Sequence, residues 1–206
     1  MSSIPPILRE LPEQILGERV LLRPFCAGDG AAIWEATEES RASISLWMPW
    51  VQHNHSSDDS EEYARNAHAR WITREALPMG VWDKNTGRFL GQCLLVRPNW
   101  DIPSFEVGYW LRDSAVGHGY ITESVKLLYA LAFELLGAQH VHIHCDALNE
   151  RSANVARRLG FVHEATLRND DRDSAGKLSD TFIFALTPGD YAGVKVTWGS
   201  IEEESK

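Results

Sequence analysis

The spacing of apolar and polar residues in the first half of the chain predicts short strands interrupted by two helices. Strand side chains alternate between the two faces of a sheet, and such alternation runs over residues 18–25, 79–83, 88–96 and 104–111. Helices are expected over 27–39 and 57–75, and the second has acidic residues near its start, where the helix dipole favours them. The aromatic, proline-broken segment 46–55 is expected to be a connecting loop.

The second half of the chain predicts a regular alternation of helices and strands. Helices are expected over 122–136 and 150–159, each followed by a glycine suited to a helix end. The expected strands are 140–145, 162–167 and 180–186. The order β-α-α-β-β-β-α-β-α-β-β predicts a mixed α/β fold with helices packed on one sheet. Residues 1–16 and 191–206 are interpreted as an N-terminal extension and a C-terminal tail around a single domain over 17–190.

Composition narrows the class of protein. With 44% hydrophobic and 24% charged residues, the 206-residue chain is typical of a globular domain. The net charge of −9 argues against nucleic-acid binding and would attract amines or basic peptides. No apolar run approaches the roughly 18 residues of a membrane span, so no membrane partner is expected. The three cysteines are scattered without CxxC spacing, which suggests free thiols in a reducing compartment. Because the N-terminus also lacks an apolar signal core, a cytoplasmic location is expected.

The most informative segment joins a predicted strand to a helix through Gly117-His118-Gly119. Glycines allow successive backbone N–H groups to point into one concavity, and a helix N-terminus adds unpaired donors and positive potential. The segment therefore predicts a site for a diphosphate. A GxG pair is also common in ordinary turns. A Rossmann motif is excluded because position 122 is threonine, and a Walker A loop because no GK[ST] follows.

A second group of polar residues follows the strand predicted to end at Cys145. Asn149 is a good N-cap for the next helix, and Ser152 lies in its first turn. Open α/β sheets bind ligands just beyond the carboxyl ends of their strands, although a well-capped helix explains the two residues equally well.

Three segments taken together resemble the core of the GNAT acetyltransferase superfamily. They are VGYWL, VGHGYITE and C…N-x-x-S-x-x-V-x-x-x-x-GF. Within this superfamily, the chain is similar to the ribosomal-protein N-terminal (alanine or serine) acetyltransferases over residues of about 18–186. The supporting segments are ERVLLRPF, the WMPW loop and DTFIFAL. The resemblance implies the GNAT fold, a twisted mixed sheet of about seven strands flanked by about four helices. In that fold the central parallel strands splay apart, and acetyl-CoA lies in the gap. Members often pair, so a homodimer is also implied.

The resemblance also implies which residues bind acetyl-CoA. The backbone of 116–122 would hold the pyrophosphate, Asn149 the pantetheine arm, Ser152 the sulfur, and the backbone of 109–111 the pantetheine and thioester. The implied contacts are Tyr109, Trp110, Leu111, Val116, Gly117, His118, Gly119, Tyr120, Ile121, Thr122, Asn149 and Ser152. Three positions depart from the family pattern: Val116 replaces a polar residue, Ile121 a small one, and Ala156 the tyrosine that often protonates the thiolate.

The implied reaction is direct attack of a neutral amine on the thioester in a ternary complex. An α-amino group has a pKa of about 8, so a modest base suffices for it. Glu106 matches the position of the base in histone-type members, although a structural role is equally open. Ser152 would hydrogen-bond the departing thiolate, and a backbone N–H near Trp110 would stabilise the oxyanion.

Other residues suggest weaker roles. Trp47 and Trp50 could line the acceptor site or simply pack on the core, and Asp180 could bind the acceptor ammonium. His140, His142 and His144 alternate at a spacing that can ligate zinc, but no acidic partner is evident in the sequence, so no metal is expected. Arg157 and Arg158 could reach the CoA ribose phosphate or be merely solvated.

The predicted function is acetyl transfer from acetyl-CoA to a primary amine, with a protein or peptide N-terminus favoured. One alternative is acetylation of a small amine, an amino acid derivative or an antibiotic. Another is a non-catalytic acyl-CoA-binding module, which Val116 and Ala156 would suit. An open groove beside the loop 47–50 would favour a peptide acceptor, and a closed pocket a small one.

Overall fold

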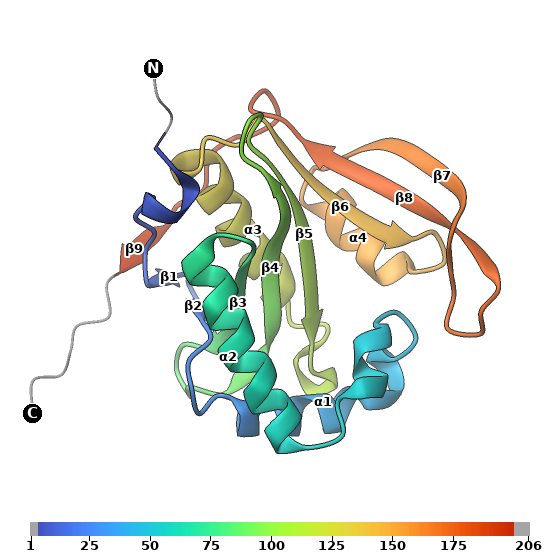
Figure 1. The fold of residues 1–206 in the computed structure, drawn as a ribbon. Coiled ribbons are helices and arrows are strands. Elements are labelled where there is room, and N and C mark those ends of the chain that lie inside the picture. Colours follow the sequence, from blue (N-terminus) through green and yellow to red (C-terminus); the bar gives the residue numbers. More distant parts are fainter. Residues whose placement is uncertain (1–3, 200–206) are drawn as a thin grey trace, which may run out of the picture.

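The computed structural model describes residues 4–199 and arranges them as one nine-stranded mixed sheet with helices on both faces (Figure 1). The sheet order is β7-β8-β6-β5-β4-β3-β2-β1-β9. The strands are β1 (Gln14–Leu16), β2 (Val20–Pro24), β3 (Leu77–Asp83), β4 (Phe89–Asn99), β5 (Ser104–Leu111), β6 (His140–Asp146), β7 (Val162–Arg172), β8 (Leu178–Leu186) and β9 (Thr197–Gly199). Neighbouring strands are antiparallel except β5 and β6, which are parallel.

The predicted order of elements is confirmed from β2 to β8. The α-helices of the described residues are α1 (Gly30–Ile44), α2 (Ser57–Thr73), α3 (Tyr120–Ala130) and α4 (Glu150–Arg158). The expected loop contains a short 3₁₀ turn, Pro49–His53, and α3 continues into a π-helical turn, Leu131–Leu135. Among the described residues, none of these helices has both the length and the apolar content needed to cross a bilayer.

Two short strands explain why the sheet has nine strands where about seven were expected. Residues 14–16 and 197–199, expected in the extension and the tail, form β1 and β9, which pair with each other at one edge of the sheet. Three residues are too few to show a strand period in a sequence. Residues 1–3 of the expected extension and 200–206 of the expected tail lie outside the described residues.

Helix ends follow the capping chemistry of the sequence. The Ser56 side chain accepts a hydrogen bond from the Asp59 N–H (3.1 Å) and begins α2, whereas Asn149 accepts one from the Ser152 N–H (3.1 Å) and begins α4. Each side chain satisfies an N–H that has no partner within its own helix. The expected N-cap role of Asn149 is therefore confirmed.

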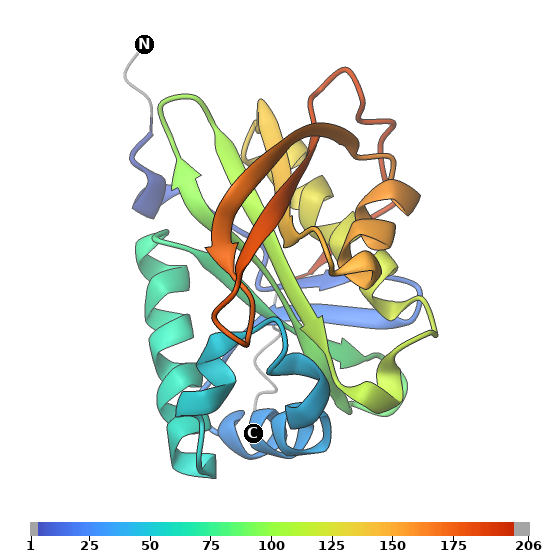
Figure 2. The same cartoon turned by 90° about the vertical axis from the view of Figure 1, so that its right-hand side faces the viewer.

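The two faces of the sheet are covered by different helix pairs (Figures 1 and 2). Helices α1 and α2 bury one apolar cluster, with Phe25, Phe89 and Trp110 among its larger members. Helices α3 and α4 cover the other face, where Leu128 and Phe105 belong to the main core. Fully burying side chains of this size contributes roughly 1.5–3 kcal/mol each, so both faces of the sheet are held firmly.

Strands β5 and β6 stay together over only three residue pairs. Their parallel register joins Ser104 to His140, Phe105 to Val141 and Glu106 to His142, and no further pair follows. Beyond Glu106 the two strands separate, while the β7–β8 hairpin curves away with β6 (Figure 1). The edge of β5 that faces β6 consequently lacks a strand partner from residue 107 onward, and this is where a groove opens.

Candidate active site

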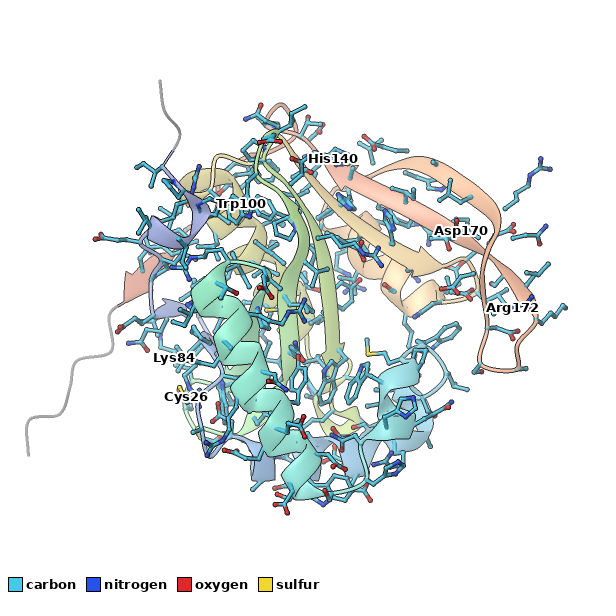
Figure 3. The ribbon with its side chains drawn as sticks, viewed as in Figure 1. Cys26, Lys84, Trp100, His140, Asp170 and Arg172 are labelled. Atoms are coloured by element: carbon cyan, nitrogen blue, oxygen red, sulfur yellow. The ribbon has the colours of Figure 1, made fainter. Side chains whose placement is uncertain are left out.

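A groove of about 1600 Å³ occupies the gap between the separated strands. It is lined by β5 (106–111), β6 (143–146), the start of α4 and the turn before α3. The lining also includes the tip of the β7–β8 hairpin, 170–174, and residues 43–49, where the Ser43 hydroxyl donates to Asp113 (2.6 Å) just before that turn. Asp170 and Arg172 mark that hairpin in Figure 3. The groove is therefore bounded by segments from most of the chain.

The turn before α3 presents a row of unused amide groups to this groove. Gly117 (φ 87°) and Gly119 (φ 81°) have left-handed backbone conformations that favour glycine. The Val116 N–H is bonded to the Asp113 carbonyl (3.1 Å), but within residues 4–199 the six N–H groups of 117–122 donate to no acceptor. Such a row at a helix N-terminus is suited to bind an anion, because donors and helix dipole act together.

Arg19 and Glu123 fasten this turn from behind. The Arg19 Nη1 donates to the His118 carbonyl (2.8 Å), and its Nε to Glu123 Oε2 (2.9 Å). Glu123 Oε1 accepts from the backbone N–H groups of Arg19 (2.8 Å) and Val20 (3.2 Å). Gly17 makes room for this contact, since a Cβ there would lie 2.5 Å from Glu123 Oε1. No sequence pattern identified Arg19, because it lies about a hundred residues from its partners.

We expect Glu123→Ala to lower the free energy of unfolding by about 1–3 kcal/mol, because two backbone N–H groups and Arg19 lose their acceptor. Urea unfolding of the variant measures the change. Glu62→Ala, an exposed substitution on α2, should leave the stability within about 0.5 kcal/mol of the parent chain. Equal stability of the two variants would show that Glu123 does not hold the turn.

A second part of the groove brings Tyr109, Cys145 and Ser152 together. The Tyr109 hydroxyl lies 2.9 Å from Ser152 Oγ and donates to the Ser152 carbonyl at 3.2 Å. Burial raises the pKa of the Tyr109 hydroxyl well above its usual range, and burial likewise raises the pKa of the neighbouring Cys145 thiol. Both groups are therefore protonated near neutral pH.

The third part of the groove is centred on the Glu106 carboxylate, whose side chain is 15% exposed. Arg97 Nη1 lies 2.7 Å from Glu106 Oε2, and the same oxygen lies 4.0 Å from His142 Nε2 and 3.9 Å from His144 Nδ1. Burial, followed by the charge of His144, lowers the pKa of His142 to about 4, so this ring is neutral at pH 7. The expectation that the histidines have no acidic partner is wrong, because the parallel register places Glu106 beside His142.

Most residues predicted to form the site line the groove. They are Trp47, Glu106, Tyr109, Trp110, Leu111, Val116, Gly117, His118, Gly119, Ile121, Thr122, Asn149 and Ser152.

Three predicted residues do not line the groove. The Tyr120 hydroxyl donates to Asp83 (3.2 Å), although its backbone N–H belongs to the row of free amides. The Trp50 ring packs against Trp110 with centroids 5.8 Å apart, which matches the expectation of packing on the core. The Asp180 carboxylate accepts a hydrogen bond from the Asn169 N–H (2.9 Å) and is not part of the groove lining.

Cationic side chains gather around the free amides in spite of the negative net charge. Arg19, Lys126, Arg151 and Arg158 line the groove. Arg158 Nη1 also donates to Thr122 Oγ1 (3.1 Å) and so connects α4 to the start of α3. Arg19 and Arg158 thus place two cationic side chains directly at the turn with the free amides.

Comparison with known families and proteins agrees with this geometry. The family described as "Acetyltransferase (GNAT) domain" matches residues 19–162. YdaF of Bacillus subtilis, provisionally named a ribosomal N-acetyltransferase, is 33% identical over 90 residues. The match covers 44% of this chain and 49% of YdaF, so the chain spans about half the length of this relative.

Solved structures show the same fold at low identity. RimL, a ribosomal L7/L12 alpha-N-protein acetyltransferase in complex with coenzyme A, has a TM-score of 0.77 and 19% identity over 82% of this chain and 94% of its own. The microcin C7 self-immunity acetyltransferase MccE, in complex with acetyl-CoA and AMP, has a TM-score of 0.77 and 18% identity over 82% of this chain and 93% of its own. At these identities the likeness establishes the fold.

Proposed function

Because the chain belongs to the GNAT acetyltransferase family, we propose that it transfers the acetyl group of acetyl-CoA to a primary amine, with the N-terminal α-amino group of a protein or peptide as acceptor. The observation that carries this proposal is the row of six N–H groups at 117–122 without an acceptor in the described chain. It lies at the edge of a groove between two parallel strands that separate. A diphosphate bound there accepts from several of these amides and lies among cationic side chains.

An extended acceptor is supported by the shape of the groove. Its volume of about 1600 Å³ exceeds the roughly 300–1000 Å³ of a typical small-ligand pocket. Trp47 and the hairpin tip 170–174 also line the groove, so an extended chain has walls to lie against while its end reaches the Glu106 carboxylate. The name of YdaF supports the same class of acceptor. A homodimer belongs to the proposal as well, and sedimentation velocity tests it.

In the proposed reaction the neutral amine attacks the thioester carbonyl carbon. The C–N bond forms, the C–S bond breaks, and the amine proton passes to Glu106, directly or through water. In this structure Arg97 forms an ion pair with the Glu106 carboxylate. The Arg97 side chain is 74% exposed, and exposed ion pairs are weak. An incoming ammonium can therefore take the place of the guanidinium. Backbone N–H groups near Trp110, on the unpaired edge of β5, stabilise the oxyanion.

The departing thiolate accepts a hydrogen bond from the Ser152 hydroxyl and takes up its proton from water. Ala156 stands where many family members have a tyrosine acid, and Tyr109 supplies a hydroxyl from the opposite side of the groove, 2.9 Å from Ser152 Oγ. Tyr109 thus orients the Ser152 hydroxyl. The sequence suggested only the backbone of Tyr109, because residues on β5 and α4 are 43 positions apart.

We expect Tyr109→Phe to lower kcat by about 10-fold, because the Ser152 hydroxyl that stabilises the thiolate loses the partner that orients it. The affinity for acetyl-CoA, measured by calorimetry, should stay within about twofold. Tyr191→Phe removes another partly buried hydroxyl, which is bonded to Glu134 outside the groove, and should leave kcat unchanged. An unchanged kcat in Tyr109→Phe, with only the melting temperature lowered, would assign Tyr109 a purely structural role.

A turnover screen tests the proposed acceptor. Free thiol release is followed with acetyl-CoA and three groups of amines: peptides with a free N-terminus, the same peptides with a blocked N-terminus and an internal lysine, and small amines such as amino acid amides. Turnover confined to free N-termini supports the proposal. Turnover confined to small amines overturns the acceptor, and binding of acetyl-CoA without turnover of any amine overturns catalysis.

A further inference from the structure

Three potential metal ligands meet at one end of the groove. Glu106, His142 and His144 each offer a ligand atom, and these atoms lie within 4.8 Å of one another. The cluster comes from two adjacent strands: Glu106 pairs with His142 in the parallel register, and His144 lies two residues further along the same face of β6. The side chains are 15%, 16% and 30% exposed, so the cluster is largely shielded from solvent yet reachable from the groove.

We propose that Glu106, His142 and His144 form a binding site for a divalent cation of the zinc class, and that occupancy of this site inhibits the enzyme. Two imidazoles and one carboxylate are a known ligand set for Zn²⁺ that leaves a fourth position open. The mixture of nitrogen and oxygen ligands favours zinc and its transition-metal neighbours over magnesium or calcium.

The geometry needs only a small adjustment to close around an ion. Ligand atoms of a tetrahedral zinc site lie about 3.4 Å apart, given bonds of about 2.1 Å. Here the carboxylate oxygen lies 4.0 Å from His142 Nε2 and 3.9 Å from His144 Nδ1. The buried Nδ1 of His142 has no hydrogen-bond partner among the described residues, so no such bond resists rotation of the ring.

Arg97 is the group that an ion must displace. Its guanidinium lies 2.7 Å from Glu106 Oε2, the oxygen that also faces both histidines. Because Arg97 is 74% exposed, release of this ion pair costs little. A metal ion and Arg97 therefore compete for one carboxylate, and Arg97→Gln should increase the affinity for zinc.

Inhibition follows from the position of the cluster and rests on the proposed role of Glu106 as base. A carboxylate bound to zinc cannot accept the amine proton, and the ion occupies the space that the acceptor nitrogen needs. The amide row at 117–122 is a separate part of the groove. Zinc should consequently compete with the acceptor amine and leave the binding of acetyl-CoA unchanged.

Calorimetric titration of the metal-free full chain with Zn²⁺ tests the site apart from activity, and Co²⁺ absorption reports tetrahedral ligation. We expect one ion per chain, no binding of Mg²⁺, and at least about 10-fold weaker zinc binding in His142→Gln and His144→Gln. His140→Gln is the matched control, because His140 (labelled in Figure 3) lies on the same face of β6 but pairs with Glu164 at 3.1 Å. Cys145→Ser tests whether the Cys145 thiolate, rather than the two histidines, binds the zinc ion.

Several outcomes would overturn the site. These are the absence of zinc binding, equal affinity in His144→Gln and His140→Gln, and loss of binding only in Cys145→Ser. If His142→Gln does not fold, two other measurements test the site. One is the zinc affinity of His144→Gln, and the other is the change in the imidazole nitrogen chemical shifts of the parent chain when zinc is added. Binding that depends on both histidines without any inhibition would retain the metal site and refute Glu106 as the base.

Discussion

Replacing Glu106 by glutamine is expected to lower kcat by about 10²- to 10⁴-fold, the usual contribution of a positioned general base. Glutamine has nearly the same shape and can still accept a hydrogen bond from Arg97, but it cannot take up a proton at neutral pH. Steady-state turnover with a saturating peptide amine, in the presence of a chelator, measures the loss. Because Glu106 lies apart from the free amides at 117–122, the affinity for acetyl-CoA should change by less than about twofold.

Glu164→Gln is the control for this experiment. Glu164 lies on β7, pairs with His140 (3.1 Å) and does not line the groove, so its replacement changes the charge by the same amount without touching the site. We expect full turnover in this variant. If Glu106→Gln keeps more than about a tenth of the parent kcat, the carboxylate is structural and the proton leaves by another route.

A negative charge placed in the row of free amides should weaken acetyl-CoA binding by about 10- to 100-fold. Gly117 has a φ of 87°, and a Cβ at this position would meet nothing within 4 Å. Aspartate and asparagine both tolerate the left-handed conformation and have nearly the same size. In Gly117→Asp the carboxylate repels the bound diphosphate, whereas Gly117→Asn adds only a neutral amide. At a few ångströms and partial exposure such repulsion amounts to about 2 kcal/mol.

The difference between these two variants is the informative quantity, because any backbone strain is common to both. Calorimetry with acetyl-CoA measures it, and raising the salt concentration should shrink it, since ions screen the repulsion. Equal dissociation constants for the two variants would place the diphosphate elsewhere. Urea unfolding checks that the two variants remain equally stable.

Local chemistry made most of the fold predictable. Strand β5 was predicted with the same bounds as observed, Ser104–Leu111, because its alternation is clear and proline and turn residues precede it. The start of α2 at Ser57 was predicted together with its acidic first turn, and the structure adds the Ser56 cap. Prediction was poorer where tertiary contacts extend an element: β7 continues to Arg172, well beyond the apolar residues that indicated it, because it pairs with β8.

The candidate site likewise has a part that the sequence predicted and a part that it did not. The amide row at 117–122 and the Asn149 cap were predictable, because glycine and asparagine at these positions have local conformational reasons to be there. Arg97 was not predictable, because its contact with Glu106 depends on a strand irregularity between Val96 and Asn99. Tyr109 was expected to contribute its backbone, and only the tertiary structure shows its hydroxyl beside Ser152 across the groove.

The sequence by itself determined the order of the elements, the family resemblance and the glycine turn, since each depends on residues that are close together along the chain. The tertiary structure alone decided which distant side chains meet: Glu106 with His142 and His144, Tyr109 with Ser152, and Arg19 with Glu123. The physical reason is that strand register and helix packing result from burying the whole apolar surface at once. No short stretch of sequence contains that information.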